Sequence, residues 1–185
     1  MDDSQIVALY WQRSEHAIEA TAKKYGRYCH AIAYNILANQ PDAEECVNDT
    51  YLGAWNSIPP HKPAILSAYL AKLTRRISLN RWRDTSRQKR GGGEVPLALE
   101  ELADILPGTE DTAAAVEQKE LSTAIGKFVS TLPQPERDVF ISRYFLLVPQ
   151  EQICGKFGFS PSKTKSMLFR TRNKLRTHLE KEGLL

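Results

Sequence analysis

Along this chain the large apolar residues recur at steps of three and four, and this spacing limits the fold to helices. The first such series forms one helical face and consists of Ile18, Ala22, Tyr25, Cys29, Ile32 and Ile36. No stretch before Gly91 alternates apolar and polar residues as a half-buried strand does. The sequence therefore predicts an all-α protein.

Prolines divide the first half of the chain into successive helices. Pro41 and Asp42 open a second helix, whose first turn carries Glu44 and Glu45, where carboxylates interact favourably with the helix dipole. This second helix ends at Pro59. A third helix follows, and its apolar face consists of Leu66, Tyr69, Leu70, Leu73 and Ile77.

A glycine-rich, acidic segment separates the two halves of the chain. It begins at Gly91-Gly92-Gly93, and few large apolar residues follow before about position 112. We interpret residues 91–112 as a flexible linker with at most one short helical turn. The chain then divides into two small helical domains, residues 1–90 and residues 113–185.

The second domain ends in a pattern typical of a helix-turn-helix. Gly158 suits the left-handed residue after a helix, Ser160 suits the next N-cap, and Pro161 suits the first position of the helix that follows. Two helices joined by a tight turn of this kind form a helix-turn-helix, with the final helix over about residues 161–179.

Charge is distributed unevenly, although the net charge is only +3. Between Lys62 and Arg90 there are nine Lys or Arg against one acidic residue, and between Lys163 and Lys181 there are seven against one. The segment from Glu94 to Glu120 carries eight Asp or Glu against one Lys. This basic-acidic-basic profile indicates two polyanion-binding surfaces separated by a segment that cannot bind the same polyanion.

The final helix has the pattern of a recognition helix in a DNA major groove. Its apolar side is predicted to be Thr164, Leu168, Thr171, Leu175 and Leu179. The predicted DNA-binding residues on the other sides are Lys163, Lys165, Ser166, Phe169, Arg170, Asn173 and Lys174. Arg side chains bond guanine through two contacts, and an exposed Phe contacts thymine methyl groups. A solvated charged face on a packing helix is the alternative.

Two further faces lie in the first domain. The third helix carries candidate residues for binding unpaired bases: Lys72, Arg75, Arg76, Trp82 and Arg83. The second helix carries a candidate protein-docking face: Asp42, Glu45, Asn48, Asp49, Leu52 and Trp55. For both tryptophans, packing in the core is the alternative.

The sequence predicts no catalysis, metal or cofactor. None of the four histidines has Cys or Asp partners at metal-ligand spacing, and the glycine run lacks the Lys-Ser/Thr of a phosphate-binding loop. Cys29, Cys46 and Cys154 are expected to be buried free thiols. Without a signal-like N-terminus or a long apolar stretch, we expect a cytoplasmic protein that does not insert into membranes.

Four segments together resemble the extracytoplasmic-function sigma factors of bacterial RNA polymerase. Residues 42–55 resemble the polymerase-binding helix of that family, and residues 69–83 its promoter-melting helix. Residues 132–144 resemble the start of its C-terminal domain, and residues 165–176 its recognition helix. The four segments occur in the order and spacing of the family.

This resemblance implies a fold of a region 2 domain and a region 4 domain. It also implies that residues 42–55 dock on core RNA polymerase, that the loop 59–66 and the helix through Arg83 capture unpaired promoter bases, and that the recognition helix reads the upstream element as duplex. An anti-sigma factor is an expected further partner. The alternatives are a stand-alone helix-turn-helix regulator, which should dimerise on a palindrome, and a helical adaptor that binds no DNA.

Overall fold

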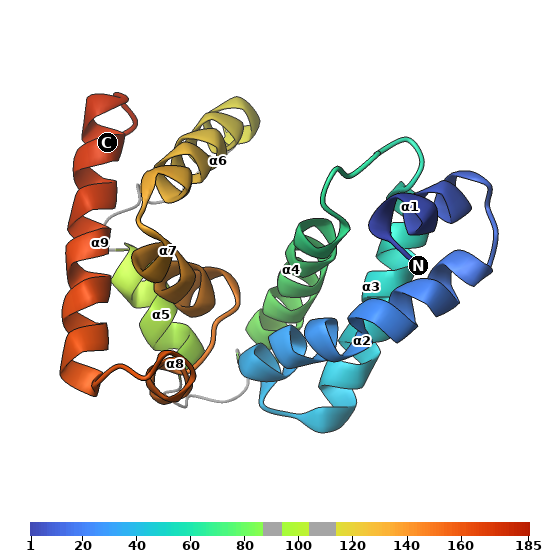
Figure 1. The fold of residues 1–185 in the computed structure, drawn as a ribbon, viewed down its shortest axis with the longest axis horizontal. Helices are drawn as coiled ribbons and strands as arrows, with labels where there is room; N and C mark the ends of the chain where they lie inside the picture. The colour runs from blue at the N-terminus through green and yellow to red at the C-terminus, as the bar shows by residue number, and fades with distance from the viewer. Residues whose placement is uncertain (87–93, 104–113) are drawn as a thin grey trace. The chain divides into compact units, whose positions relative to one another are not determined.

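The computed structural model describes residues 1–86, 94–103 and 114–185, and within these ranges it is helical and contains no strand (Figure 1). The chain divides into two compact units, Met1–Gly91 (unit 1) and Gly92–Leu185 (unit 2). The prediction of an all-α, two-domain fold is confirmed. The glycine run at 91–93 lies outside the described residues.

Unit 1 is built from four helices: α1 (Asp3–Trp11), α2 (His16–Leu37), α3 (Gln40–Ser57) and α4 (Leu66–Ser86). Helix α2 packs against the other three, and α3 packs against α4. Helix α3 begins where the sequence predicts, because the side chain of Asn39 accepts a hydrogen bond from the amide of Asp42 at 3.0 Å.

Helix α1 has no counterpart in the sequence-based prediction. Its N-terminus is closed by a capping box, in which Asp2 Oδ1 accepts from the amide of Gln5 at 2.8 Å and Gln5 Oε1 accepts from the amide of Asp2 at 3.0 Å. The helix packs its apolar residues onto α2. The hydroxyl groups of Tyr10 and Thr21 are hydrogen-bonded at 2.9 Å within that contact.

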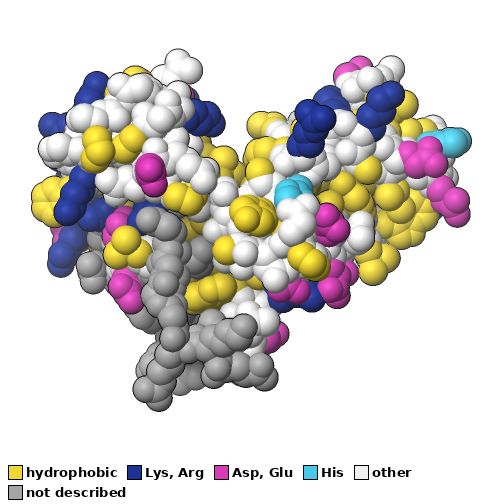
Figure 2. All heavy atoms as spheres, turned by 90° about the horizontal axis from the view of Figure 1, so that it is seen from below, with side chains coloured by type: hydrophobic (Ala, Val, Ile, Leu, Met, Phe, Trp, Pro, Cys, Tyr) yellow, Lys and Arg dark blue, Asp and Glu magenta, His cyan; other side chains and the backbone are white. Residues whose placement is uncertain are grey.

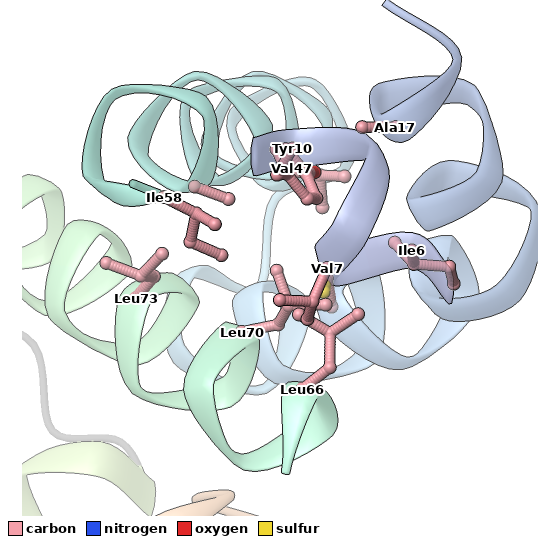
Figure 3. Close-up of a cluster of buried hydrophobic side chains, with 11 residues drawn as sticks. Ile6, Val7, Tyr10, Ala17, Val47, Ile58, Leu66, Leu70 and Leu73 are labelled. Atoms are coloured by element: carbon pink, nitrogen blue, oxygen red, sulfur yellow. The ribbon is translucent and has the colours of Figure 1, made fainter. Parts of the chain in front are cut away.

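The core of unit 1 takes side chains from all four helices and from the residue that ends α3. Figure 3 shows Val7 of α1 beside Leu66 and Leu70 of α4, while Leu73 of α4 lies beside Ile58; Ile6 and Tyr10 of α1 belong to the same cluster. Of these seven, six are less than 5% exposed, and Leu73 is 7% exposed. A buried hydrogen bond of 3.1 Å from Thr50 to Thr74 adds a polar link between α3 and α4.

Unit 2 contains α5 (Glu94–Ala103), α6 (Ala114–Thr131), α7 (Gln134–Phe140), the π-helical turn η1 (Ile141–Phe145), α8 (Gln150–Phe157) and α9 (Pro161–Lys181). Helix α9 packs against α6, α7 and α8, and η1 contacts α5 and α8. Aromatic rings join these elements, since Phe140 lies 6.2 Å from Phe128 and 4.8 Å from Tyr144 between ring centroids.

The segment expected to be a linker differs from the sequence-based interpretation. Instead of one helical turn, it contains the ten-residue helix α5, which is part of unit 2. The remaining linker residues 91–93 and 104–112 lie outside the described parts of the chain. The division into residues 1–90, 91–112 and 113–185 stays a prediction.

One expectation about the cysteines needs correction. Cys29 and Cys46 are buried as predicted, but Cys154 is only half-buried. Its thiol lies at the contact between α8 and α9, where it donates to the buried hydroxyl of Thr164 at 3.3 Å. Among the described residues no helix has both the length and the apolar character needed to cross a membrane.

A matched pair of leucine substitutions tests the core of unit 1. Leu70 is fully buried, whereas Leu52 is 56% exposed. We expect Leu70→Ala to lower the free energy of unfolding of unit 1 by about 2–5 kcal/mol, because it leaves a cavity. Leu52→Ala should change it by less than about 0.5 kcal/mol.

All three tryptophans lie in unit 1, so tryptophan fluorescence during urea unfolding reports on this unit alone. An equal loss of stability in the two variants would contradict the assignment of Leu70 to the core.

Candidate functional site

The turn between α8 and α9 has the geometry of a helix-turn-helix. Gly158 ends α8 with a φ of +64°, in the left-handed region that side chains with a Cβ rarely adopt. Ser160 then caps α9, because its side chain accepts a hydrogen bond from the amide of Lys163 at 3.2 Å. Pro161 follows within the first turn. The predicted roles of Gly158, Ser160 and Pro161 are confirmed.

Two phenylalanines and two lysines surround this turn. The rings of Phe157 and Phe159 are stacked with their centroids 6.2 Å apart. The ammonium group of Lys163 lies 3.9 Å from the centroid of Phe159, and that of Lys156 lies 5.2 Å from the centroid of Phe157. Lys163 lies in the first turn of α9, and its cation–π contact with Phe159 restrains its side chain against the turn.

Helix α9 separates its apolar and polar residues as the spacing predicts. Thr164, Leu168, Thr171, Leu175 and Leu179 are each 2% exposed or less. The seven predicted DNA-binding residues are all exposed: Lys163, Lys165, Ser166, Phe169, Arg170, Asn173 and Lys174. Lys and Arg side chains gather on the surface of unit 2 at the left of Figure 2.

Of these seven residues, Lys174 has an ion-pair partner within unit 2. Its ammonium group lies 2.8 Å from a carboxylate oxygen of Glu136 in α7. Lys174 also lines an open groove of about 560 Å³, together with Phe128 of α6 and with Arg170 and Asn173 of α9. The polar face of α9 therefore presents charged, amide and aromatic groups from a backbone fixed by packing.

An ion cluster that was not predicted from the sequence joins α5, η1 and α9. Glu101 of α5 accepts from Arg143 at 3.2 Å, from Tyr144 at 2.8 Å and from Arg172 of α9 at 3.1 Å. Arg172 also donates to the hydroxyl oxygen of Tyr144 at 2.6 Å. Burial raises the pKa of the Tyr144 hydroxyl; the hydrogen bond from Arg172 lowers this pKa and the hydrogen bond to Glu101 raises it. The net shift is upward, so the hydroxyl stays protonated and can donate.

The candidate base-binding residues of α4 differ in exposure. Lys72, Arg76 and Arg83 are exposed, whereas Arg75 is half-buried. Burial lowers the pKa of the Arg75 guanidinium, and the positive charge of Arg83 lowers it further. Trp82, which was expected to project outward, is half-buried.

The candidate docking face of α3 is exposed along one side of the helix. Asn48, Asp49 and Leu52 are all exposed, and Leu52 is 56% exposed. On the opposite side of the helix the apolar residues Ala43, Cys46, Val47 and Ala54 are buried, and so is the polar residue Thr50. This side of α3 therefore combines carboxylate, amide and leucine side chains on a rigid helix.

Two of the predicted docking residues interact with α4. The guanidinium of Arg81 lies 3.0 Å from Asp42 and 2.6 Å from Glu45. The hydrogen bond from Arg81 lowers the pKa of the Glu45 carboxyl, and Glu45 in turn raises the pKa of Arg81. Arg81 thus neutralises part of the acidic start of α3, which the sequence analysis treated as a separate face.

Trp55 combines the two roles that the sequence left open. It is half-buried against the core, with its ring centroid 6.3 Å from that of Tyr10. The guanidinium carbon of Arg13 lies 5.3 Å from its ring centroid, and the same guanidinium donates to the Trp55 carbonyl at 2.6 Å. Core packing thus explains the inner side of Trp55.

No group of His, Cys, Asp or Glu in the described ranges has a metal-binding arrangement.

The fold and these surfaces define a two-unit helical protein whose C-terminal unit carries a helix-turn-helix. A family model described as Sigma-70 region 2 matches residues 21–88, and one described as Sigma-70, region 4 matches residues 122–175. The first match lies within unit 1 and the second within unit 2. The chain belongs to the sigma-70 family of RNA polymerase sigma factors, in its extracytoplasmic-function subfamily.

Curated relatives resemble the chain along most of its length. The probable RNA polymerase sigma factor RfaY of Xanthomonas campestris pv. campestris is 26% identical over 187 residues, which cover 97% of this chain and 46% of that protein. The ECF RNA polymerase sigma factor SigE of Mycolicibacterium smegmatis is 23% identical over 155 residues, which cover 83% of this chain and 58% of that protein. The chain thus spans about half the length of these curated relatives.

A solved structure, that of CnrH in complex with the cytosolic domain of CnrY, is 19% identical to the chain. It covers 96% of this chain and 97% of its own, with a TM-score of 0.40.

Two glycines of the helix-turn-helix offer a matched test of the turn. Gly158→Ala should destabilise unit 2 by about 1–2 kcal/mol, because alanine is strained at a φ of +64°. Gly155 lies inside α8 with open space around an added Cβ, so Gly155→Ala should stabilise the helix by about 0.5–1 kcal/mol. Amide hydrogen exchange of residues 150–181 in the full chain measures both effects, and shifts of the same sign would contradict the left-handed turn.

Proposed function

We propose that this chain is an RNA polymerase sigma factor that binds core polymerase and directs initiation at specific promoters. In this proposal unit 1 docks on the polymerase and captures the separated promoter strand, while unit 2 reads the upstream element as duplex. The chain itself performs no catalysis and needs no cofactor. The observation that carries the proposal is the exposed polar face of α9, the second helix of a helix-turn-helix whose N-terminus is capped by Ser160, in a chain that belongs to the sigma-70 family.

The geometry and chemistry of α9 support its proposed assignment to duplex DNA. An α-helix fits the major groove, and the N-terminal residues of a recognition helix are the ones that reach base edges. Lys165, Ser166, Phe169 and Arg170 lie in the first half of α9 and are all exposed. They supply ammonium, hydroxyl, aromatic and guanidinium groups, which between them bond phosphate, bases and thymine methyl groups.

The assignment of α4 to unpaired DNA rests on its basic side. Lys72, Arg76 and Arg83 are exposed on this helix, and Trp82 keeps part of its ring accessible. Cations that follow a strand, next to an aromatic ring on which a base stacks, are the usual components of a single-strand site. This arrangement supports capture of separated promoter bases by α4 with the loop 59–66.

The assignment of α3 to the polymerase rests on its charge and its exposed leucine. Asp49 and Glu45, of which Glu45 is paired with Arg81, are carboxylates that disfavour contact with DNA phosphates, so this side of unit 1 is poorly suited to nucleic acid. Leu52 is an exposed apolar group beside them, which suits the centre of a protein interface. An anti-sigma factor that covers these surfaces is a further proposed partner, on the ground of family membership alone.

Binding with and without core polymerase tests the proposal directly. The full chain is mixed with promoter fragments that are first identified by transcription of genomic fragments with core polymerase. We expect a gel shift and start-site-specific transcripts only when core polymerase is present. Sequence-specific binding by the chain alone would identify a stand-alone regulator, and no binding under either condition would identify an adaptor.

Arg170 is the residue whose loss should most clearly alter promoter choice. Arg170→Ala should weaken binding of the upstream element by about 1–3 kcal/mol and relax the base preference at one position. Arg176→Ala is the control, since it removes the same charge from the C-terminal half of α9, where Arg176 pairs with Glu180 at 3.2 Å. Competition binding of holoenzyme to single-base promoter variants measures both. An unchanged base preference in Arg170→Ala would contradict the register of the recognition helix.

Leu52 should contribute to polymerase affinity without contributing to fold. Leu52→Ala should weaken binding of core polymerase by about 1–2 kcal/mol, the value of a leucine side chain removed from an interface. Leu185→Ala is the matched control, because Leu185 is also exposed but lies at the end of unit 2. Fluorescence anisotropy of labelled chain titrated with core polymerase gives the affinities. Equal affinities of the two variants for core polymerase would contradict the proposal that α3 contacts the polymerase.

A further inference from the structure

Glu101 forms a link between the acidic segment of the chain and the recognition helix. Its carboxylate lies on α5, which the sequence assigns to the linker, yet it accepts hydrogen bonds from η1 and from α9. One oxygen bonds Arg143, and the other bonds both Tyr144 and Arg172. Every atom of this cluster lies within unit 2.

The surroundings of the cluster hold the carboxylate in place. The side chain of Arg143 has no exposed surface, and Glu101 is 20% exposed. A buried guanidinium is destabilised by the loss of a carboxylate partner, so the ion pair with Glu101 stabilises Arg143 in the core. Because Arg143 is fixed inside the core, Glu101 and the turn of α5 that carries it are fixed as well.

Arg172 connects Glu101 with an exposed side chain on the surface of α9. Its side chain is 19% exposed, and the guanidinium is held between Glu101 at 3.1 Å and the Tyr144 hydroxyl at 2.6 Å. The guanidinium carbon lies 6.0 Å from the ring centroid of Phe169, at the range of a cation–π contact. Arg172 thus connects a half-buried carboxylate with the side chain of Phe169, a residue that is 56% exposed.

An exposed phenylalanine on a helix ordinarily moves among several side-chain rotamers. A ring that is held in one rotamer loses less entropy on binding, so a fixed Phe169 would contact a thymine methyl group at lower cost. The face of α9 that carries Phe169 is the one assigned to base reading under the proposed function.

We propose that Glu101 is a positioning residue for promoter recognition, which fixes Arg172 and through it sets the Phe169 ring against a thymine methyl group of the upstream element. The proposal rests on the proposed function, because it requires α9 to read duplex DNA. It assigns a role to a residue that lies outside the faces of α3, α4 and α9 proposed to bind polymerase and DNA.

Replacement of thymine by uracil in the upstream element tests the proposal, because uracil lacks only the methyl group. Holoenzyme with the unaltered chain should bind one uracil-substituted promoter about fourfold more weakly, the value of one buried methyl-sized group. With Phe169→Ala this methyl effect should disappear. With Glu101→Gln it should fall below about twofold, although the chain still binds core polymerase and initiates transcription.

Two further variants separate positioning from folding. Glu100→Gln removes the same charge from the neighbouring, exposed residue and should keep the full methyl effect. Arg172→Met keeps the ion pair of Glu101 with the buried Arg143, so the core stays compensated, but it removes the guanidinium from Phe169. Arg172→Met should therefore lose the methyl effect even if Glu101→Gln destabilises unit 2. Hydrogen exchange of unit 2 reports the stability of each variant.

The outcomes distinguish the positioning role from the proposed function. A full methyl effect in folded Arg172→Met or Glu101→Gln would overturn the positioning role while leaving the sigma-factor function intact. The absence of a methyl effect at every thymine with the unaltered chain would also overturn it. A chain that never directs core polymerase to a start site would overturn the proposed function and this inference together.

Discussion

Arg143 carries the largest fully buried side chain in the described parts of the molecule, and its charge must be compensated where it lies. Loss of a carboxylate partner from a buried guanidinium costs several kcal/mol, so the ion pair of Arg143 with Glu101 at 3.2 Å stabilises unit 2. Since Glu101 belongs to α5, this ion pair holds α5 against the rest of the unit. The same carboxylate bonds Arg172, so one ion cluster fixes both the core of unit 2 and a side chain of the recognition helix.

In unit 1, apolar packing rather than an ion cluster fixes the helices that carry the exposed polar faces. Its four helices bury leucine, isoleucine, valine and tyrosine side chains between them, and the long helices α3 and α4 keep charged residues outside. The two polar faces are joined by Arg81, which bonds Asp42 and Glu45. An acidic face and a basic face on adjacent helices give one small unit two surfaces with different affinities, one suited to protein and one to nucleic acid.

The sequence predicted the features that depend on local spacing. The apolar series, the prolines at helix starts and the pattern Gly158, Ser160, Pro161 determine α2, α3, α4 and the helix-turn-helix, and the exposed side of α9 follows from the same periodicity. The ion cluster could not be predicted from the sequence, because Glu101 is separated along the chain from Arg143 by 42 residues and from Arg172 by 71 residues. Local residue patterns do not extend over such sequence separations. The short helix α1 was also missed, although the pair Asp2 and Gln5 forms a capping box that could have marked it. Trp82 was expected outside because helical spacing alone does not show how far neighbouring side chains cover a large ring.

Site-specific photo-crosslinking tests the central claim, that α3 contacts polymerase while α9 contacts promoter duplex. A photoreactive phenylalanine analogue is placed at position 52 in one sample and at position 169 in another, and each chain is irradiated with promoter DNA in the presence and absence of core polymerase. We expect position 52 to crosslink to a polymerase subunit and position 169 to crosslink to upstream DNA only when polymerase is present. Crosslinks from position 169 to DNA that are equally strong without polymerase, or the absence of any polymerase crosslink from position 52, would contradict the central claim.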